Sequence, residues 1–270
     1  MKNSTTLLAL LIACVPSVIT FAADATYHHI HLRASDTAAA AQWYATHMGG
    51  EATKLGPYDG VRMSSALLFV FPENQPGVDR SKHEGELLGS EGTAVDHIGF
   101  SFKDLAAKME SYKEAGVEIL QEARDVGGMF KYGFVRDPWG TKIEVMEDPE
   151  LYGFHHVHVV SKDPEEDIKW YQEIFGGEIT TYKGLAPLPA IKYGGMWLIA
   201  SKSDKELAPT TMHHSMDHLG WGFTDLAAEI KRFKERGEKL PLDLFNFGGT
   251  NIAFIESPNG ALIELVEVKK

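Results

Sequence analysis

The chain carries an internal duplication, and this feature limits its fold more than any other. Three stretches of the first half recur in the second half in the same order: HIHLRASD (29–36) as HVHVVSKD (156–163), DHIGFSFKDL (96–105) as DHLGWGFTDL (217–226), and FVRDPWGTKIEV (134–145) as FIESPNGALIEL (254–265). Two copies of one pattern are expected to form two copies of one structural unit. We therefore predict a tandem repeat of one fold.

Each copy retains two histidines and one glutamate at matched positions. Elsewhere the copies differ, since Arg136 is matched by Glu256 and Lys142 by Leu262. A single histidine is more often a packed polar residue. Two full sets favour a divalent metal, which imidazoles and a carboxylate hold while leaving positions open for substrate. We predict one metal in each repeat, held by that repeat's own triad: His29, His97 and Glu144 in the first, and His156, His218 and Glu264 in the second.

The first 25 residues have the pattern of a secretory signal. Lys2 precedes an apolar run over residues 7–21, and the small residues typical of a cleavage site follow at Ala22, Ala23 and Ala25. The run is too short for a stable membrane span. We expect an exported protein, periplasmic or secreted, with lipid attachment at Cys14 as the alternative. After cleavage no cysteine remains, so nitrogen and oxygen must hold any metal.

The remaining length suits two domains of ordinary size. We predict a first domain over residues 26–147 and a second over 153–270, with the boundary around Asp148 and Pro149. The 38 acidic and 26 basic residues give a net charge of −12, which opposes binding to nucleic acid or anionic membranes. The expected partner is a small-molecule substrate, bound by a monomer or a homodimer.

Capping residues and periodicity predict the elements of each repeat. A strand over 27–33 precedes a helix capped by Asp36 and ended by Gly49, and the second repeat copies this helix with Asp163 and Gly176. The other expected elements are helices from Asp104 to Gly116 and from Asp225 to Gly237, hairpins at 64–65 and 194–195, tight turns at 137–140 and 257–260, and final strands over 142–146 and 262–266. Each repeat therefore mixes strands and helices.

Strand alternation places side chains i and i+2 on one face. His31 and His158 therefore share the face of the first-strand ligands, and we predict that they act as acid and base beside the metals. The same alternation predicts that His28 and His155 face away. Packed or solvated roles for His31 and His158 stay open at this point.

Two cations, Arg33 and Lys142, flank only the first-repeat site. Arg33 is therefore a candidate for binding an anionic substrate. The aromatic pairs Trp43-Tyr44 and Trp170-Tyr171 lie on predicted helix faces, where core packing explains them better than ligand binding.

These motifs resemble the vicinal oxygen chelate superfamily, which includes glyoxalases, bleomycin-resistance proteins and extradiol dioxygenases. The resemblance covers the chain after its signal and rests on the first-strand His followed by Asp and a helix, on DHIGFSF and DHLGWGF, and on DPWGTKIEV and SPNGALIEL. It implies an α+β fold of two tandem glyoxalase-like domains. Each domain would consist of paired βαβββ modules whose mixed sheet curls around a metal cleft. It also implies that the six predicted ligands hold metal.

Departures from the family pattern bear on the reaction. Glyoxalase I enzymes generally place a fourth ligand, Glu or Gln, on a strand that here reads ALLFVF (66–71) or MWLIAS (196–201), and they use glutathione, which an exported protein seldom meets. Extradiol dioxygenases keep a Tyr where Phe134 and Phe254 stand, although Tyr132 lies two residues away and is a candidate substrate-binding residue.

We therefore expect an exported metal-dependent enzyme that chelates a small oxygen-rich substrate, with dioxygenase chemistry and Fe²⁺ favoured because three ligands leave room for O₂. A lyase or isomerase of the glyoxalase type, using Zn²⁺, Mn²⁺ or Ni²⁺, is one alternative. A periplasmic protein that binds or sequesters a small molecule without turnover is the other.

Overall fold

The computed structural model describes residues 25–73 and 88–269 of the chain. The predicted signal at residues 1–25, with Cys14, therefore lies outside the described residues except for Ala25. Within the described part, no helix is long and apolar enough to cross a membrane.

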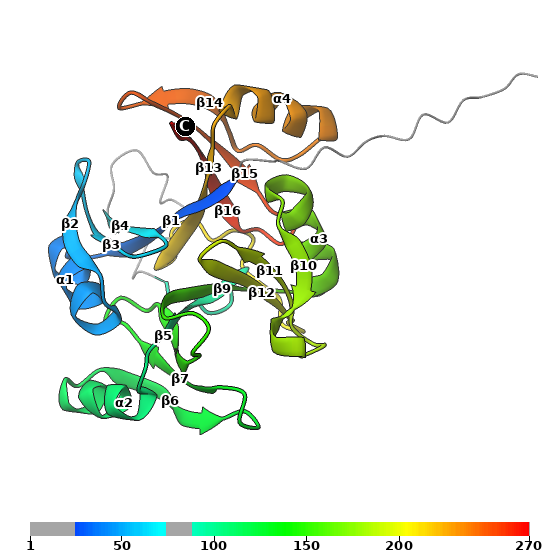
Figure 1. Ribbon diagram of the computed structural model, residues 1–270. Coiled ribbons are helices and arrows are strands. Elements are labelled where there is room, and N and C mark those ends of the chain that lie inside the picture. Colours follow the sequence, from blue (N-terminus) through cyan, green and yellow to red (C-terminus); the bar gives the residue numbers. More distant parts are fainter. Residues whose placement is uncertain (1–24, 74–87, 270) are drawn as a thin grey trace, which may run out of the picture.

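Four βαβββ modules follow one another along the chain (Figure 1). Module 1 comprises β1 (Thr26–Ala34), α1 (Thr37–Met48), β2 (Glu51–Leu55), β3 (Tyr58–Arg62) and β4 (Leu67–Pro72). Module 2 comprises β5 (Val95–Ser101), α2 (Leu105–Glu114), β6 (Glu118–Asp125), β7 (Lys131–Arg136) and β8 (Lys142–Glu147). The first sequence repeat therefore contains two modules.

The second repeat is built in the same way. Module 3 comprises β9 (Gly153–Ser161), α3 (Pro164–Phe175), β10 (Glu178–Thr181), the 3₁₀ turn η1 (Tyr182–Gly184), β11 (Pro189–Tyr193) and β12 (Met196–Lys202). Module 4 comprises β13 (Met216–Phe223), α4 (Leu226–Arg236), β14 (Leu242–Phe247), β15 (Thr250–Glu256) and β16 (Leu262–Glu267). Strand and helix positions agree with the sequence prediction.

The modules do not pair within their own repeats. Sheet I joins modules 1 and 4 in the order β14-β15-β16-β13-β1-β4-β3-β2, and sheet II joins modules 2 and 3 in the order β10-β11-β12-β9-β5-β8-β7-β6. Two eight-stranded mixed sheets with flanking helices confirm the predicted fold class. The prediction that each repeat closes its own sheet is wrong.

Antiparallel pairs at the centre of each sheet join the two repeats. β1 pairs with β13, and β5 pairs with β9. The segment at 148–152 consequently connects β8 to β9 inside sheet II, so the boundary predicted there does not separate two sheets. The sequence does not distinguish the two possible strand pairings, because both repeats present the same alternating pattern to a partner strand.

Side-chain caps fix the helix starts as the sequence predicts. The carboxylates of Asp36, Asp104, Asp163 and Asp225 accept from the backbone N–H three residues later, which satisfies a donor that the first helical turn leaves free. Each helix packs against strands of its own module.

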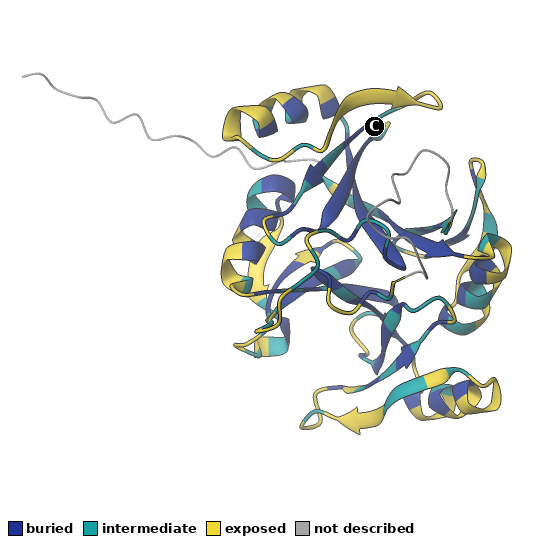
Figure 2. Ribbon diagram, turned by 180° about the vertical axis from the view of Figure 1, so that it is seen from behind, coloured by how far each residue is buried: buried dark blue, intermediate teal, exposed yellow. Residues whose placement is uncertain are grey.

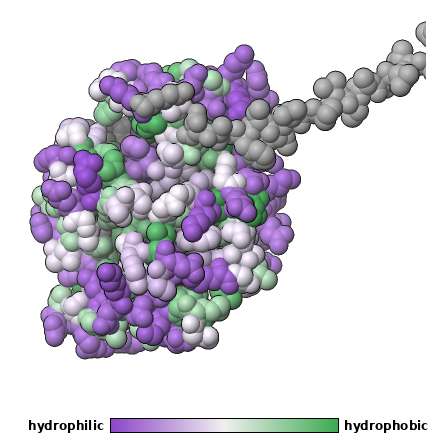
Figure 3. Space-filling view, in the orientation of Figure 1, coloured by the Kyte–Doolittle hydropathy of each residue, from purple (hydrophilic) through white to green (hydrophobic). Residues whose placement is uncertain are grey.

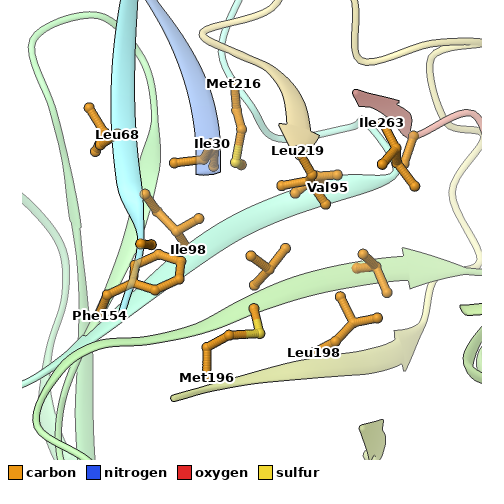
Figure 4. Packing of buried hydrophobic residues seen from close by; sticks show 14 of the residues in the cluster. Ile30, Leu68, Val95, Ile98, Phe154, Met196, Leu198, Met216, Leu219 and Ile263 are labelled. Atoms are coloured by element: carbon orange, nitrogen blue, oxygen red, sulfur yellow. The ribbon is translucent and has the colours of Figure 1, made fainter. Parts of the chain in front are cut away.

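One continuous hydrophobic core lies between the sheets and under the helices. Ile30 and Leu68 of sheet I and Ile98 of sheet II belong to it, as Figure 4 shows. The predicted aromatic pairs contribute, because Tyr44 and Tyr171 are fully buried. Figure 2 shows this buried centre and the exposed outer strands and helix faces. The face of each sheet that is not occupied by this core carries the metal-type residues.

Candidate metal centres

Four buried side chains of sheet I converge on one point, which we call centre I: His29, His31, His218 and Glu264. Glu264 Oε2 lies 3.2 Å from His29 Nε2, 3.4 Å from His31 Nε2 and 3.2 Å from His218 Nε2. Three strands supply these residues, namely β1, β13 and β16. All four ligand atoms lie within 4.8 Å of one another.

Sheet II contains the matching cluster, centre II: His97, Glu144, His156 and His158. Glu144 Oε2 lies 3.0 Å from His97 Nε2 and 3.4 Å from His156 Nε2. His158 Nε2 instead bonds to Ser201 Oγ at 2.8 Å. The Glu and second His come from module 2, and the first-strand histidines come from module 3.

The predicted ligand residues therefore gather at two centres, but in different groups from those predicted. His29 lies with His218 and Glu264 rather than with His97 and Glu144, and His156 makes the reverse exchange. The cause is the pairing of β1 with β13 and of β9 with β5. The triads predicted within each repeat are wrong as groups.

Two glycines allow the exchanged histidines to reach these positions. Gly220 is paired with His29 and Gly99 with His156. A Cβ built on Gly220 would lie 2.1 Å from a His29 ring atom, and one built on Gly99 would lie 2.0 Å from the His156 ring. The ring lies over the backbone of the neighbouring strand, so the glycine of each DHxG motif is needed for close approach.

The donor sets fit a divalent metal. Ligands about 2.1 Å from one ion, at tetrahedral to octahedral angles, lie roughly 3.0–3.4 Å apart, which is the spacing between the carboxylate and imidazole atoms here. His29 Nε2 and His156 Nε2 are buried, and neither makes a hydrogen bond. Buried polar atoms without a partner are costly, so an ion bound between these donors would satisfy them.

A carboxylate supports the second-module histidine of each centre. His218 Nδ1 lies 2.6 Å from Asp217 Oδ1, and His97 Nδ1 lies 2.7 Å from Asp96 Oδ1. Such contacts orient a ligating imidazole and increase its basicity. Both aspartates belong to the repeated DHxG motif, and the motif alone does not predict this role.

Each of these aspartates also pairs with one cation. Arg33 Nε donates to Asp217 Oδ2 at 2.6 Å, and Lys142 Nζ donates to Asp96 Oδ1 at 2.7 Å. Arg33 is buried and paired with Asp217, and its predicted contact with an anionic substrate stays a prediction. Its predicted placement beside Lys142 at one site is wrong, because the two cations belong to different centres.

β-bulges bring two further histidines into contact with the ligands. His28 and His155 are the extra residues where the register of β1 with β13 and of β9 with β5 shifts. Their Nδ1 atoms lie 2.7 Å from His29 Nδ1 and 2.9 Å from His156 Nδ1. The prediction that they face away is wrong for their rings, because regular alternation fails at a bulge.

Among the described residues, this histidine contact continues to a carboxylate in centre II but not in centre I. His155 Nε2 lies 3.2 Å from Asp148 Oδ2, which also accepts from the Tyr182 hydroxyl at 2.9 Å. One proton arrangement satisfies the chain: His155 donates to Asp148, and His156 Nδ1 donates to His155. His156 Nε2 is then left with its lone pair toward the centre. The residue of the second repeat that matches Asp148 is Val268, which has no carboxylate.

Burial and charge set the protonation of centre I. Burial alone would lower the pKa of His218, but its hydrogen bonds to Asp217 and Glu264 outweigh this and raise the pKa to about 9. Burial lowers the pKa of His29 and holds that of His31 well below its ordinary value. Burial opposes ionisation of Glu264, yet the hydrogen bond to His218 and the close approach of His29 hold its pKa far below the usual range.

Centre II has the same distribution. Burial would lower the pKa of His97, but hydrogen bonds to Asp96 and Glu144 raise it. Burial lowers the pKa of His156 to about 4 and keeps that of His158 well below its usual value. In both centres hydrogen bonds to carboxylates favour the protonated form of one imidazole, whereas burial favours the neutral form of the first-strand pair. The neutral imidazole is the form that can bind a metal.

An aromatic residue contacts the second-module histidine of each centre. Phe134 and Phe254 contact His97 and His218, with ring centroids 5.1 and 5.3 Å apart. Tyr132 lies on the Phe134 face of β7, as expected, under the guanidinium of Arg124. Its predicted contact with substrate stays a prediction.

The family model for the glyoxalase/bleomycin resistance protein/dioxygenase superfamily matches residues 26–145 and 153–265. The chain belongs to this superfamily. The two matches coincide with the two sequence repeats, and each spans two of the structure's βαβββ modules.

Relatives of this superfamily member include lactoylglutathione lyases. That of Escherichia coli O157:H7 is 28% identical over 124 residues, which is 45% of this chain and 92% of the relative. That of Schizosaccharomyces pombe is 24% identical over 240 residues, covering 72% of this chain and 79% of the relative.

Solved structures share the complete fold of this superfamily member. Glyoxalase I from Zea mays has a TM-score of 0.70 at 19% identity and covers 90% of this chain and 92% of its own. A putative dioxygenase from Bacillus subtilis has a TM-score of 0.65 at 14% identity, covering 90% and 84%. Both reaction classes thus occur among proteins named for this fold.

Proposed function

We propose that this protein is an exported, metal-dependent lyase or isomerase that binds a small substrate through two neighbouring oxygens. The observation that supports it best is the fourth donor of centre I, His31. The expectation of dioxygenase chemistry rested on three ligands. With four protein donors, a bound ion would have room for two substrate oxygens but not for O₂ as well.

The names of the sequence relatives also support this choice, since the relatives described above are lactoylglutathione lyases. A bound ion would act as a Lewis acid toward the substrate oxygens. Glu264 and Glu144 hold the converging imidazoles together, and Asp217 and Asp96 fix the orientation of His218 and His97. Neutral His158, held by Ser201 rather than by Glu144, is available to accept a proton.

Dioxygenase activity at centre II is a second candidate. Because Ser201 holds His158 Nε2, centre II offers two histidines and one glutamate more readily than four donors. That set is typical of Fe²⁺ oxygenases. In centre I the residue that matches Ser201 is Phe71, which cannot hydrogen-bond to His31. His31 Nε2 lies 3.4 Å from Glu264 Oε2.

One comparison tests both candidates. The purified protein is loaded separately with Zn²⁺, Ni²⁺ and Fe²⁺ and assayed with α-ketoaldehydes plus thiol and with catechols, with and without oxygen. The proposal expects turnover that needs metal but not O₂. Oxygen consumption restricted to the Fe²⁺ form, retained in Glu264→Ala and lost in Glu144→Ala, would establish the second candidate instead.

Export is part of the proposal and rests on the apolar run that ends at Ala22 to Ala25. The mass of the mature N-terminus tests it. A chain that begins near residues 23–26 supports export, whereas a lipid on Cys14 would establish membrane anchoring.

A further inference from the structure

An exposed apolar strand forms the outer edge of sheet I. All six residues of β14 are exposed, and Leu242, Phe245 and Phe247 have 51%, 37% and 52% of their surface accessible. Figure 2 shows this strand exposed along its whole length, whereas hydrophobic residues are scattered over the face seen in Figure 3. Large apolar side chains on an edge strand favour aggregation unless something covers them.

Cross-strand pairing shows which way these side chains point. Leu242 is opposite Phe254, Phe245 is opposite Ile252, and Phe247 is opposite Thr250. Phe254 in turn is opposite Glu264. Directly paired residues share a face of the sheet, so the apolar side chains of β14 lie on the same face of sheet I as centre I, further toward its edge.

The opposite wall of this cleft is also aromatic. The His31 ring stacks on Phe69 at 4.8 Å and contacts Phe71 at 4.1 Å, and Tyr58 packs on Phe71 at 4.4 Å. Strands β3 and β4 on one side and β14 and β15 on the other therefore give centre I two apolar walls.

Sheet II provides an internal comparison. Gln121 and Arg124 of β6 occupy the positions of Leu242 and Phe245, because they are opposite Phe134 and Tyr132. Ser201 occupies the position of Phe71. Figure 1 shows β6 and β14 at opposite ends of the molecule. The two clefts thus differ in polarity although their metal-type residues match.

The apolar side chains of sheet II are covered by the segment that connects β10 to β11. Tyr182, Leu185 and Leu188, between β10 and β11, pack in one cluster with Phe130 and Met146. In module 1 the matched connection between β2 and β3 is only Gly56 and Pro57. Within residues 25–73 and 88–269, no matching segment of module 1 covers the apolar side chains beside centre I.

We propose that centre I takes a substrate whose two chelating oxygens carry an apolar chain or ring, which lies along Leu242, Phe245 and Phe247. The inference rests on the proposed chelating function. It assigns centre II a smaller or more polar substrate, since Arg124, Gln121 and Ser201 line that cleft. The cleft-facing direction of Phe245 and Phe247 favours a ligand over a second copy of the chain.

Two hydroxamates test the proposal, because both chelate metals through two oxygens and differ only in their tail. Acetohydroxamate and octanohydroxamate are titrated into the full protein loaded with Co²⁺, and the visible spectrum reports chelation directly. Glu144→Ala leaves centre I as the loaded site, and Glu264→Ala leaves centre II.

At centre I we expect octanohydroxamate to bind at least about 30-fold more tightly than acetohydroxamate, since each buried methylene contributes roughly fourfold to the affinity. We call this quotient of the two affinities the tail ratio. The double variant Leu242→Gln, Phe245→Arg, which copies β6, should reduce this ratio to below about threefold without changing acetohydroxamate binding. Phe247→Ser alone should reduce it partly. Leu244→Ala is the matched control, because Leu244 is 37% exposed but lies in the bulged stretch and is not paired with a cleft residue.

The proposal is overturned if the double variant leaves the tail ratio at centre I unchanged. It is also overturned if centre II shows the same tail ratio as centre I. If sedimentation shows a wild-type dimer that the double variant dissociates while the ratio stays constant, a second copy covers β14 and the proposal is wrong. If acetohydroxamate leaves the Co²⁺ spectrum unchanged, the chelating function itself fails, and this inference fails with it.

Discussion

His29 Nε2 and Glu264 Oε2 lie 3.2 Å apart although they come from the first and the last strand of the chain. Each centre therefore depends on both repeats, and neither repeat contains a complete set of donors. Variants can separate this arrangement from two independent repeats.

Paired substitutions should reveal which residues share an ion. His29→Ala with Glu264→Ala removes donors from centre I only, so the metal content should fall from about two to about one per chain, because a site that loses donors no longer competes with buffer. His29→Ala with His97→Ala removes a donor from each centre and should leave almost none. Metal analysis after dialysis against a weak chelator measures both.

The variant His29→Ala with His97→Ala distinguishes the two arrangements. If His29→Ala with His97→Ala retained one metal, those two residues would share a site and the exchanged arrangement would be wrong. Circular dichroism of each variant controls for loss of fold.

Asp148 should matter for metal binding at centre II alone. Asp148→Asn weakens the contact that orients His155 and, through it, His156, so affinity there should fall about 10- to 100-fold. Competition with a chelator in the Glu264→Ala background measures this. Tyr182→Phe, which removes one hydrogen bond but keeps the carboxylate, is the control and should change affinity little. Equal losses in both variants would mean that the effect is only structural.

Metal binding at centre I should release a proton. In the metal-free protein His218 has a pKa raised to about 9, so below that pH its proton must leave before the imidazole can bind an ion. The apparent affinity should rise about tenfold per pH unit between pH 7 and 9 and then level off. Calorimetry of Glu144→Ala at pH 7.5 in two buffers of different ionisation enthalpy counts the protons. A count near zero contradicts this protonation state.

The same shift sets the stability of the metal-free protein. A folded pKa above the unfolded value of 6.5 contributes stability that is complete below pH 6.5 and is lost as the pH rises through about 9. Urea unfolding of the metal-free protein between pH 6.5 and 9 should therefore show a falling free energy of unfolding.

Asp167 should limit stability above pH 6. Burial raises its pKa to about 6 from 3.8, so the folded state favours the protonated acid. The cost is absent below pH 3.8, grows between 3.8 and 6 and is complete above 6. Asp167→Asn still accepts from Asn259 and should stabilise the protein by about 1–2 kcal/mol at pH 7.5. Its advantage should vanish at pH 3.5, and a gain that is the same at both pH values would contradict the assignment.

Local features of the fold were predictable because they depend on short stretches. Asp36 and Asp163 cap their helices in the structure as the sequence predicts. The residue types of the two centres were also predictable, since imidazole and carboxylate recur in both repeats. Which modules pair was not, because β5 and β13 carry the same DHxG motif and either can accept a first-strand histidine.

One signal in the sequence did point to the exchange. Asp96 pairs with Lys142 of its own repeat, but the residue matched to Lys142 is Leu262, which cannot pair with Asp217. A buried aspartate needs a partner, and Arg33 of the first repeat, matched by Val160, provides it. The bulges at His28 and His155 gave no such signal, because their motifs keep regular alternation in sequence.

The exchange also determines when each sheet can form during synthesis. Sheet II needs only residues 95–202, whereas β1 at the start of the chain pairs with β13 and depends on module 4, which is made last. Contacts between distant parts of a chain slow folding and leave strand edges unpaired in the meantime. Module 1 is the first to leave the ribosome and the last to meet its partner.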